Sequence, residues 1–515
     1  MGKHFTHEID PPLVIDVGVA IWYDTGMKKS IKMSVALLAV SAAVWCAFAD
    51  DFKVAAWRGE TLALLVPDYT ELGEPPAGLE VRCGVLRPVR YRPVPEELQI
   101  AECYDVVDWS TSAGGGPRVA EISVPKDAKP GLYKWGLMDI EVVDRELPPP
   151  SEWKYYLDLW QHPWAVARYA KVQPFSKAHY AAMRPLWELL ASAGQKALTV
   201  TLVDQPWHHQ CRDAYGTMVA AKKDASGKLS FDYTIFDEYV AFGRSCGIGP
   251  HIACYTMCPW GDLVGWTDAD GRPVKVKARP GTKEFEEFWG PFLDSFTARL
   301  KAKGWFADTF ISMDERAPED VKRIADFVQA HAPGMKIALA GNRKPSEFVG
   351  ITIDSYCQYL GHLTDDFLAE VGERQAKGFV TTYYVCCGPA RPNNFLSSPP
   401  AENFWVGVYP GMVGLDGFLR WAWNSWPEEP FYDGSFRGWR AGDTYFAYPG
   451  GVPSYRVLEM RNGIATAEKI RILKEKGLFK DEIAALAKRY SYKEAMAGKT
   501  NCAKLKEETL KLVNK

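Results

Sequence analysis

Short apolar runs alternate with longer amphipathic segments between residues 155 and 423, and this alternation constrains the fold more than any other feature. Such an order is typical of βα units, in which each helix returns the chain so that successive strands pair in parallel. The runs that predict strands are residues 155–160, 197–202, 251–255, 309–313, 336–340, 351–355, 380–385 and 417–423. The segments that predict helices include residues 179–193, 285–303, 319–331 and 366–377.

The region from the first strand run to the last spans about 270 residues, which favours a (β/α)8 barrel, because such barrels usually have about 250 residues. A doubly wound open sheet is the alternative for the same order of elements. No Gly-x-Gly-x-x-Gly or phosphate-loop motif follows any of the runs, so the commonest reason to expect the open sheet is missing. We therefore predict an α/β fold built on a (β/α)8 barrel at residues 148–454.

Two segments of different character flank the predicted barrel. Residues 50–147 contain β-rich runs separated by Gly and Pro turns, which predict an N-terminal β-sandwich. Pro148-Pro149-Pro150 predicts a stiff connector between the two domains, because successive prolines fix φ and remove backbone donors. Residues 455–515 are lysine-rich and predict a short helical extension whose charges face solvent. The β-rich runs are residues 62–67, 78–82, 119–124 and 133–140.

The N-terminal region predicts a targeting signal. A basic start from Met27 precedes an apolar stretch that ends near Phe48, and small residues precede Asp50. This order is typical of a secretory signal peptide at about residues 27–49. The apolar stretch is shorter than the roughly 20 residues that span a bilayer, so stable membrane insertion is not expected. We expect residues 1–49 to be leader sequence, Met27 to be the initiator, and the protein to be secreted or periplasmic.

Charge and cysteine content limit the possible partners. The chain has 61 basic and 64 acidic residues, with no basic patch of the kind that nucleic acid requires. Without Cys46 of the leader an even number of cysteines remains, at a density far below that of a disulfide scaffold. Neither Cys254-x-x-x-Cys258 nor the cluster at residues 208–211 has the spacing of a zinc site. We therefore expect no nucleic acid, no metal and no cofactor.

Two adjacent carboxylates follow the predicted strand 309–313. Asp314 and Glu315 occupy the carboxyl end of that strand, where (β/α)8 enzymes carry their active sites. Neighbouring side chains at a strand end point in different directions. They are therefore not expected to form the conventional pair of carboxyl groups that flank a glycosidic bond from both sides. Asp-Glu-Arg before a helix is also typical of an N-terminal cap, which is the structural alternative.

Substrate-assisted hydrolysis of a glycoside suits such a pair. In that reaction the 2-acetamido oxygen of the substrate attacks the anomeric carbon, so the protein supplies only an acid/base and a group that orients the amide. We predict Glu315 as the acid/base and Asp314 as the orienting group. The charge of Asp314 is expected to keep the proton on Glu315. The 19 tryptophans fit a glycan partner, because aromatic rings stack on sugar faces, although a large aromatic core is the alternative.

Several long, tryptophan-rich blocks resemble glycoside hydrolase family 123. They include Leu159-Trp-Gln-His-Pro-Trp-Ala-Val-Ala-Arg168, Met313-Asp-Glu-Arg316, Thr381-Thr-Tyr-Tyr-Val-Cys-Cys387, Gly414-Leu-Asp-Gly-Phe-Leu-Arg-Trp-Ala-Trp-Asn-Ser-Trp426 and residues 174–185, 303–306, 397–402 and 441–445. The resemblance implies an exo-acting β-N-acetylgalactosaminidase with a β-sandwich before a (β/α)8 barrel and a substrate-assisted, retaining mechanism. It places the family's catalytic pair on Asp314 and Glu315. The chain departs from the family pattern at residues 388–390 and 208–218, where we expect substrate choice to differ.

Further site residues are predicted from their positions at or beyond the ends of the predicted strands and from the needs of the substrate-assisted reaction. Tyr384 is expected to hold the acetamido oxygen, with Tyr383 as its competitor for that role. Trp426 is the candidate wall around the sugar, Asn424 is available for hydroxyl groups, and Arg420 and Asp416 are interpreted as a structural pair. The remaining candidates for the mouth of the barrel are His162, Trp207, Tyr255, Trp260 and Trp421.

Two alternative functions share this evidence. A β-N-acetylglucosaminidase would use the same chemistry and differ only in how the 4-hydroxyl is held. A non-catalytic carbohydrate-binding barrel would have no need for an acid beside a second carboxylate. Cys386-Cys387 is compatible with a vicinal disulfide, with separate bridges and with two buried thiols.

Overall fold

The computed structural model describes residues 52–66, 72–94, 99–111 and 116–515. The predicted leader and signal peptide at residues 1–49 lie outside the described residues. Lys53–Lys515 form one compact unit. None of the described helices is both long enough and apolar enough to cross a membrane.

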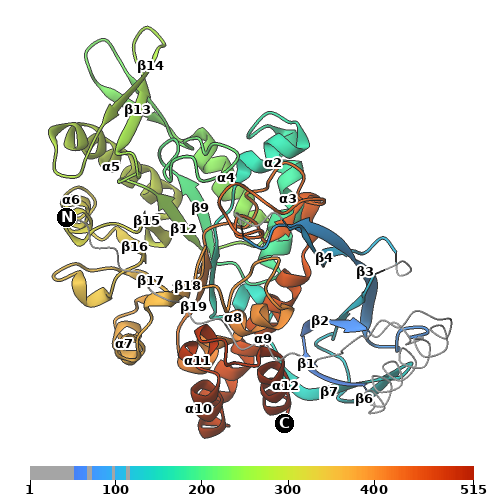
Figure 1. The fold of residues 1–515 in the computed structure, drawn as a ribbon. Coiled ribbons are helices and arrows are strands. Elements are labelled where there is room, and N and C mark those ends of the chain that lie inside the picture. Colours follow the sequence, from blue (N-terminus) through green and yellow to red (C-terminus); the bar gives the residue numbers. More distant parts are fainter. Residues whose placement is uncertain (1–51, 67–71, 95–98, 112–115) are drawn as a thin grey trace, which may run out of the picture. The chain divides into compact units, whose positions relative to one another are not determined.

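Eight parallel strands form the central sheet (Figure 1). Strands β8 and β9, at the two ends of the order, meet through one parallel bridge between Leu157 and Gln195, so the sheet is a nearly closed barrel. The predicted α/β barrel is therefore confirmed. In sheet order the strands are β8 (Tyr156–Leu159), β19 (Gly417–Arg420), β18 (Val380–Tyr384), β17 (Ser355–Tyr359), β16 (Lys336–Gly341), β15 (Thr309–Asp314), β12 (His251–Tyr255) and β9 (Ala197–Thr201).

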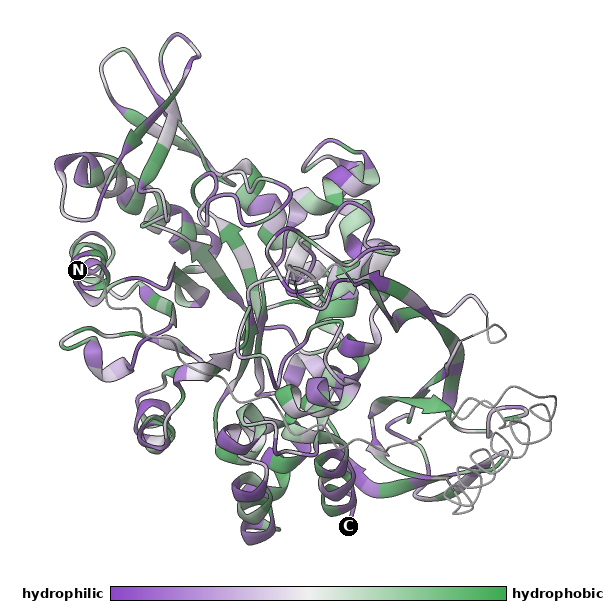
Figure 2. Cartoon of the chain, viewed as in Figure 1, coloured by the Kyte–Doolittle hydropathy of each residue, from purple (hydrophilic) through white to green (hydrophobic). Residues whose placement is uncertain are grey.

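Alternation along the strands separates two apolar environments. In β8, Leu157 and Leu159 belong to the large cluster that packs with the helices, whereas Tyr156 belongs to a smaller aromatic cluster inside the barrel. In Figure 2 the central strands are mostly green, which matches strands that are buried on both faces. The helices that follow the strands are α2 (Pro163–Ala170), α3 (Lys177–Ala191), α4 (Thr234–Ser245), α5 (Lys283–Lys303), α6 (Pro318–His331), α7 (Asp365–Ala376) and α8 (Pro400–Val413).

Two buried glutamine side chains close the seam between β8 and β9. The Gln195 amide accepts from the Leu159 N–H at 3.0 Å and donates to the Ala197 carbonyl at 2.7 Å. Gln161 accepts from the Thr199 N–H at 2.9 Å. Because these side chains take the place of missing ladder bonds, the backbone groups at the seam remain paired inside the protein.

The N-terminal strands form two small sheets that share one hydrophobic cluster. The β-sandwich and the boundaries at residues 147 and 454 stay predictions. The single strand predicted at residues 133–140 is wrong, because the chain turns at Gly136, whose φ of 58° is left-handed, and forms a hairpin. One sheet has the order β1 (Phe52–Arg58), β7 (Met138–Glu146), β6 (Gly131–Trp135), and the other has the order β2 (Thr61–Val66), β5 (Arg118–Ser123), β3 (Glu80–Tyr91), β4 (Ala101–Asp108).

The C-terminal extension is helical, as predicted, but many of its charges are buried. Arg456 of the first helix pairs with Asp105 of β4 at 3.0 Å, and Lys469 pairs with Glu60 at 2.5 Å. The prediction that these charges face solvent is therefore wrong for that helix, because the N-terminal sheets cover it and supply the opposite charges. The helices are α9 (Tyr455–Glu475), α10 (Lys480–Arg489), α11 (Tyr492–Met496) and α12 (Cys502–Val513).

Short strands also decorate the loops of the barrel. The loops after β9 and β12 contribute one four-stranded sheet, which carries the labels β13 and β14 in Figure 1. A two-stranded pair lies in the loop after β19. These strands are β10 (Ala220–Lys223), β11 (Leu229–Asp232), β13 (Leu263–Thr267), β14 (Pro273–Lys277), β20 (Ala447–Tyr448) and β21 (Val452–Pro453).

Candidate active site

Asp314 and Glu315 line the same pocket at the carboxyl end of β15. Glu315 has a left-handed backbone, with φ of 50°, and its N–H donates to the Ala340 carbonyl at 2.8 Å. A left-handed glutamate costs about 1 kcal/mol or more, and such strained residues cluster at functional sites. The turn overcomes the alternation of a regular strand, so the two neighbouring carboxylates reach one cavity instead of pointing apart.

Burial and charge act together on Asp314. Loss of hydration raises the pKa of Asp314 well above its ordinary value, the negative charge of Glu315 raises it further, and the Arg316 guanidinium opposes both. Arg316 is held nearby by two hydrogen bonds to the Cys258 carbonyl, at 3.0 and 2.8 Å. In the structure the raised pKa belongs to Asp314, whereas the sequence pattern predicts that Glu315 keeps the proton.

Tyr384 reaches the carboxylate pair from β18. Its hydroxyl donates to Glu315 Oε1 at 2.6 Å. Burial, followed by the charge of Glu315, raises the pKa of Tyr384 far above its ordinary value, so the phenol remains a donor. Tyr383 points to the other side of the strand and donates to the Val406 carbonyl of α8 at 2.8 Å. Of the two tyrosines, only Tyr384 lines the pocket.

The pocket has a volume of about 150 Å³ and aromatic walls. The Trp160 ring stacks on Trp207 with centroids 4.9 Å apart, and Tyr255 lies against both rings beneath the surface. Of the predicted mouth residues, Trp207, Trp260 and Trp421 are in the lining. The lining residues are Trp160, Trp207, Gln210, Trp260, Asp314, Glu315, Ala340, Tyr384, Cys386, Cys387, Leu419, Trp421 and Trp439.

Three other predicted residues lie outside this lining. His162 is buried. Its backbone N–H donates to Asn424 Oδ1 at 2.8 Å, and Asn424 Nδ2 donates to the backbone carbonyl of His162 at 3.0 Å. Burial lowers the pKa of His162 to about 3, so the imidazole is neutral. Trp426 is also buried and donates to the Ala447 carbonyl at 2.7 Å. The Asn424 side chain thus joins the loops after β8 and β19, whereas the Trp426 bond lies within the loop after β19.

Arg420 and Asp416 do not form the pair that we predicted. Arg420 binds Asp443 at 3.0 Å, with both side chains fully buried, and Asp443 also accepts from the Trp421 indole at 3.1 Å. Asp416 instead accepts from the Thr381 N–H at 2.6 Å. Asp443 lies in a loop with no local motif, so its pairing depends on the tertiary fold. Its contacts hold Trp421 in the pocket wall.

Several lining residues escaped prediction. Trp160 shares the inward alternation of Tyr156 and could have been found from it, whereas Gln210 and Trp439 come from irregular loops without a sequence signal. Cys386 and Cys387 have free thiols whose sulfur atoms are 3.8 Å apart. The hydrogen bond between the two thiols lowers the pKa of Cys387 to about 7. A reactive thiol therefore faces the same cavity as the carboxylates.

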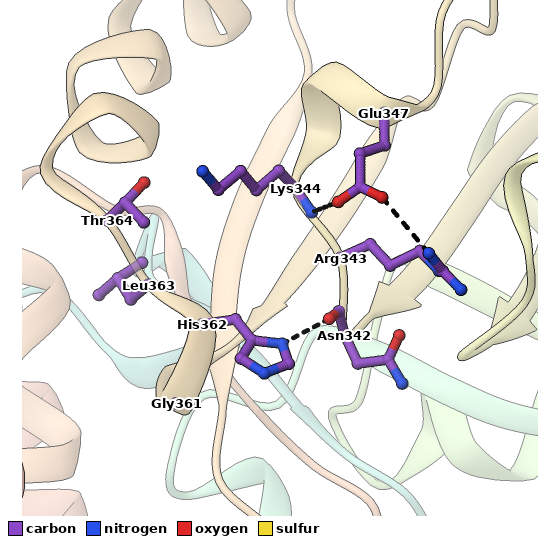
Figure 3. Close-up of a pocket in the computed structure, with 8 residues that line it drawn as sticks. All are labelled: Asn342, Arg343, Lys344, Glu347, Gly361, His362, Leu363 and Thr364. Atoms are coloured by element: carbon purple, nitrogen blue, oxygen red, sulfur yellow. Dashed lines mark hydrogen bonds and ion pairs between the residues drawn. The ribbon is translucent and has the colours of Figure 1, made fainter.

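A separate pocket lies beyond the ends of β16 and β17 (Figure 3). Its Arg343 is already paired with Glu347, at 3.4 Å, and the same glutamate accepts from the Lys344 N–H at 2.9 Å. It shares no lining residue with the carboxylate pocket. Among the described residues, no group of three or more His, Cys, Asp and Glu side chains is arranged to hold a metal ion.

Comparisons with known proteins give a family and a fold for the chain. The family model described as "Glycoside hydrolase 123, catalytic domain" matches residues 160–473. The solved structure of a family 123 glycoside hydrolase from Clostridium perfringens, studied for glycolipid glycan hydrolysis, is 23% identical, with a TM-score of 0.80 over 90% of this chain and 93% of that chain. A maltogenic α-amylase from Thermotoga neapolitana has a TM-score of only 0.35 at 10% identity, over 63% of this chain and 77% of its own. No curated protein matches the sequence.

Proposed function

The chain belongs to glycoside hydrolase family 123, and from this premise we propose that it removes terminal, β-linked N-acetylgalactosamine from glycans by a retaining, substrate-assisted mechanism. One observation carries the proposal: Asp314 and Glu315 are adjacent in sequence yet both line one small pocket. A protein nucleophile and an acid must flank the scissile bond from opposite faces of the sugar, and two neighbouring residues at one strand end are poorly placed to do so. A nucleophile supplied by the substrate suits this geometry.

In the first step the acetamido oxygen attacks the anomeric carbon while Glu315 gives its proton to the leaving glycosidic oxygen. Asp314 accepts the acetamido N–H, and its negative charge stabilises the positive oxazolinium ring. The raised pKa of Asp314 keeps a proton on this residue in the free protein, so that proton must pass to Glu315 when the substrate binds. Glu315 then carries the proton that it gives to the leaving group, and the positive charge that develops in the reaction stabilises the ionised Asp314. In the second step Glu315 takes a proton from water as the water attacks the same carbon, which gives a product of retained configuration.

Tyr384 serves the acetamido group in this proposal. In the free protein its hydroxyl donates to Glu315, so it must exchange this partner for the acetamido oxygen when the sugar enters. Donation to that oxygen fixes the amide for attack at the anomeric carbon. The aromatic walls around the pocket offer apolar faces to the sugar ring and to the acetamido methyl group. We also propose that the protein acts outside the cytoplasm, on the basis of the signal-like sequence at residues 27–49.

The test is hydrolysis of 4-nitrophenyl N-acetyl-β-galactosaminide by residues 50–515. Glu315→Gln and Asp314→Asn should each lower kcat/KM by at least about a hundredfold, because each removes a group that acts in the transition state. A substrate without the acetamido group should not react, and the first product seen by NMR should be the β-anomer. Faster cleavage of the glucosaminide would favour the alternative hexosamine. Survival of activity in both variants would overturn the mechanism.

A further inference from the structure

A second pocket opens directly beside the carboxylate pocket. It measures about 560 Å³, against about 150 Å³ for the first. Ligand pockets for whole molecules usually exceed about 300 Å³, so the smaller one suits a single sugar residue and the rest of a glycan must lie outside it. Four residues line both pockets, which makes the larger one its natural continuation. They are Trp207, Gln210, Trp260 and Trp439.

Three barrel loops build this second pocket, those after β9, β12 and β19, and hydrogen bonds fasten the first to the last. From the loop after β19, Arg437 donates to the His209 carbonyl at 2.8 Å, and the Trp439 indole donates to the Gln210 carbonyl at 3.3 Å. His208 and Arg437 both have left-handed backbones, with φ of 55° and 48°. Two non-glycine residues in this conformation persist only where their surroundings hold them, so the wall of the pocket is an ordered surface.

The chemistry of the wall combines aromatic faces with an unneutralised cation. Three tryptophans provide stacking surfaces for a sugar ring. Arg437 is exposed and forms no ion pair with any residue that the structure describes, and one of its N–H groups binds a backbone carbonyl. The remaining guanidinium donors suit a carboxylate or sulfate, which arginine binds in a forked geometry. The imidazoles of His208 and His209 add further polar groups to the same wall.

We propose that this second pocket binds the sugar next to the terminal hexosamine and prefers one that carries a carboxylate or sulfate, with Arg437 as the anion-binding residue. The inference rests on the proposed function and names the substrate class: an acidic glycan that ends in an uncharged hexosamine. The pocket of Figure 3 is a poor candidate for the same role, since its Arg343 is already paired with Glu347.

The experiment compares disaccharides that differ only in charge. The hexosamine that the aryl-glycoside assay selects is joined β1,4 to glucose, to glucuronic acid or to glucose 6-sulfate, and kcat/KM is measured for each. The wild-type protein should favour at least one acidic disaccharide over the neutral one by about tenfold, which is the usual worth of a hydrogen bond to a charged group. The two acidic arms show whether the anion is a carboxylate or a sulfate.

Variants locate the preference. Arg437→Gln should bring the acidic-to-neutral ratio close to one, Arg437→Lys should keep part of it, and the matched control Arg343→Gln should leave it unchanged. Raising the salt concentration should lower the wild-type ratio through screening, a readout that needs no variant to fold.

Two results would overturn the inference and leave the proposed function standing. One is a wild-type ratio near one together with cleavage of the aryl glycoside. The other is a wild-type preference for the acidic disaccharide that survives in Arg437→Gln, whatever the result for Arg343→Gln. No cleavage of any substrate, the aryl glycoside included, would overturn the proposed function and the inference with it.

Discussion

At the scale of single residues, the Tyr384 hydroxyl is the contact that most directly serves the carboxylates. Tyr384→Phe removes the donor to Glu315 and, in the proposed complex, to the acetamido oxygen. We expect kcat/KM on the aryl glycoside to fall about ten- to a hundredfold, since one preorganised donor is typically worth about that much or more. Tyr383→Phe is the matched control, because that hydroxyl binds a helix carbonyl on the other side of the strand. Equal losses in the two variants would contradict the assignment.

The thiol of Cys387 should report on the pocket. The hydrogen bond with Cys386 lowers the pKa of Cys387 to about 7. The rate of alkylation by iodoacetamide should therefore rise with pH, with a midpoint near pH 7. Because the thiol lines the cavity, the released hexosamine should slow labelling, and labelling should inhibit hydrolysis. Mass spectrometry locates the label, and Cys387→Ser is the control. Labelling that the sugar does not affect would contradict the position of this residue in the substrate pocket.

A buried carboxyl inside the barrel should make stability depend on pH. Burial raises the pKa of Asp158 to about 7, and its Oδ1 atom has no hydrogen-bond partner. The folded protein therefore holds a proton between the ordinary pKa of about 4 and about 7 that the unfolded chain has lost, so stability falls as pH rises through this window. Asp158→Asn should remove the effect and be more stable relative to wild type at pH 8 than at pH 5, by up to about 3 kcal/mol. Urea unfolding at the two pH values measures this difference, and a constant difference would contradict it.

Residue-level prediction grouped three residues at places where an apolar strand ends in unusual polar residues. Asp314, Glu315 and Tyr384 each directly follow or end such a strand, and the structure brings them into one pocket. Prediction missed residues whose position depends on irregular loops, such as Gln210 and Trp439. It also did not foresee that Glu315 turns back through a left-handed backbone, because no local pattern marks that conformation in a residue other than glycine.

At the scale of elements, the junction between β8 and β9 is held by glutamine side chains instead of by the backbone hydrogen bonds of a regular sheet. Gln195→Ala leaves the Leu159 N–H without its amide acceptor and leaves the Ala197 carbonyl with only the longer bond from Gln161, at 3.3 Å. We expect a loss of about 3 kcal/mol in the free energy of unfolding, the usual cost of buried groups left unpaired. Gln375→Ala is the control, because its bonds to Gly414 and Asp416 are exposed and should contribute less than about 1 kcal/mol. Urea denaturation compares the two, and similar small losses would show that the seam tolerates open backbone groups.

Most element boundaries followed from periodicity, and the exceptions have physical reasons. The strand predicted at residues 351–355 lies at 355–359 in the structure, because the apolar Ile-Thr-Ile stretch precedes the strand and the strand itself reads Ser-Tyr-Cys-Gln-Tyr. Most residues of this strand are small or polar, so its sequence lacks the apolar alternation from which a strand is predicted. The role of Gln161 and Gln195 could not be predicted either, because a glutamine in a sequence is usually taken for a surface residue.

At the scale of the whole molecule, α9 joins the N-terminal sheets to the barrel through buried charges. Arg456 is enclosed with Asp105, which also accepts from the Tyr448 hydroxyl at 2.7 Å. A second contact joins Asn462 to the backbone of Ala63 on the edge strand β2, at 3.0 and 2.7 Å. Lysine and arginine in a C-terminal helix look solvent-exposed in a sequence, and only the folded sheets reveal their partners. The strands were predictable from alternation, but their attachment to α9 was not.

This attachment predicts that the described unit unfolds as one. Arg456→Met leaves Asp105 charged and enclosed, so we expect a loss of about 3–5 kcal/mol in the free energy of unfolding. Adding Asp105→Leu should recover much of the loss, because a buried pair replaced by apolar groups is often neutral. If α9 couples the two parts, tryptophan fluorescence and far-ultraviolet circular dichroism should report one shared transition in every variant. Two separate unfolding transitions, of which a variant lowered only one, would instead mean that the N-terminal sheets unfold independently. In that case α9 would belong to the barrel alone.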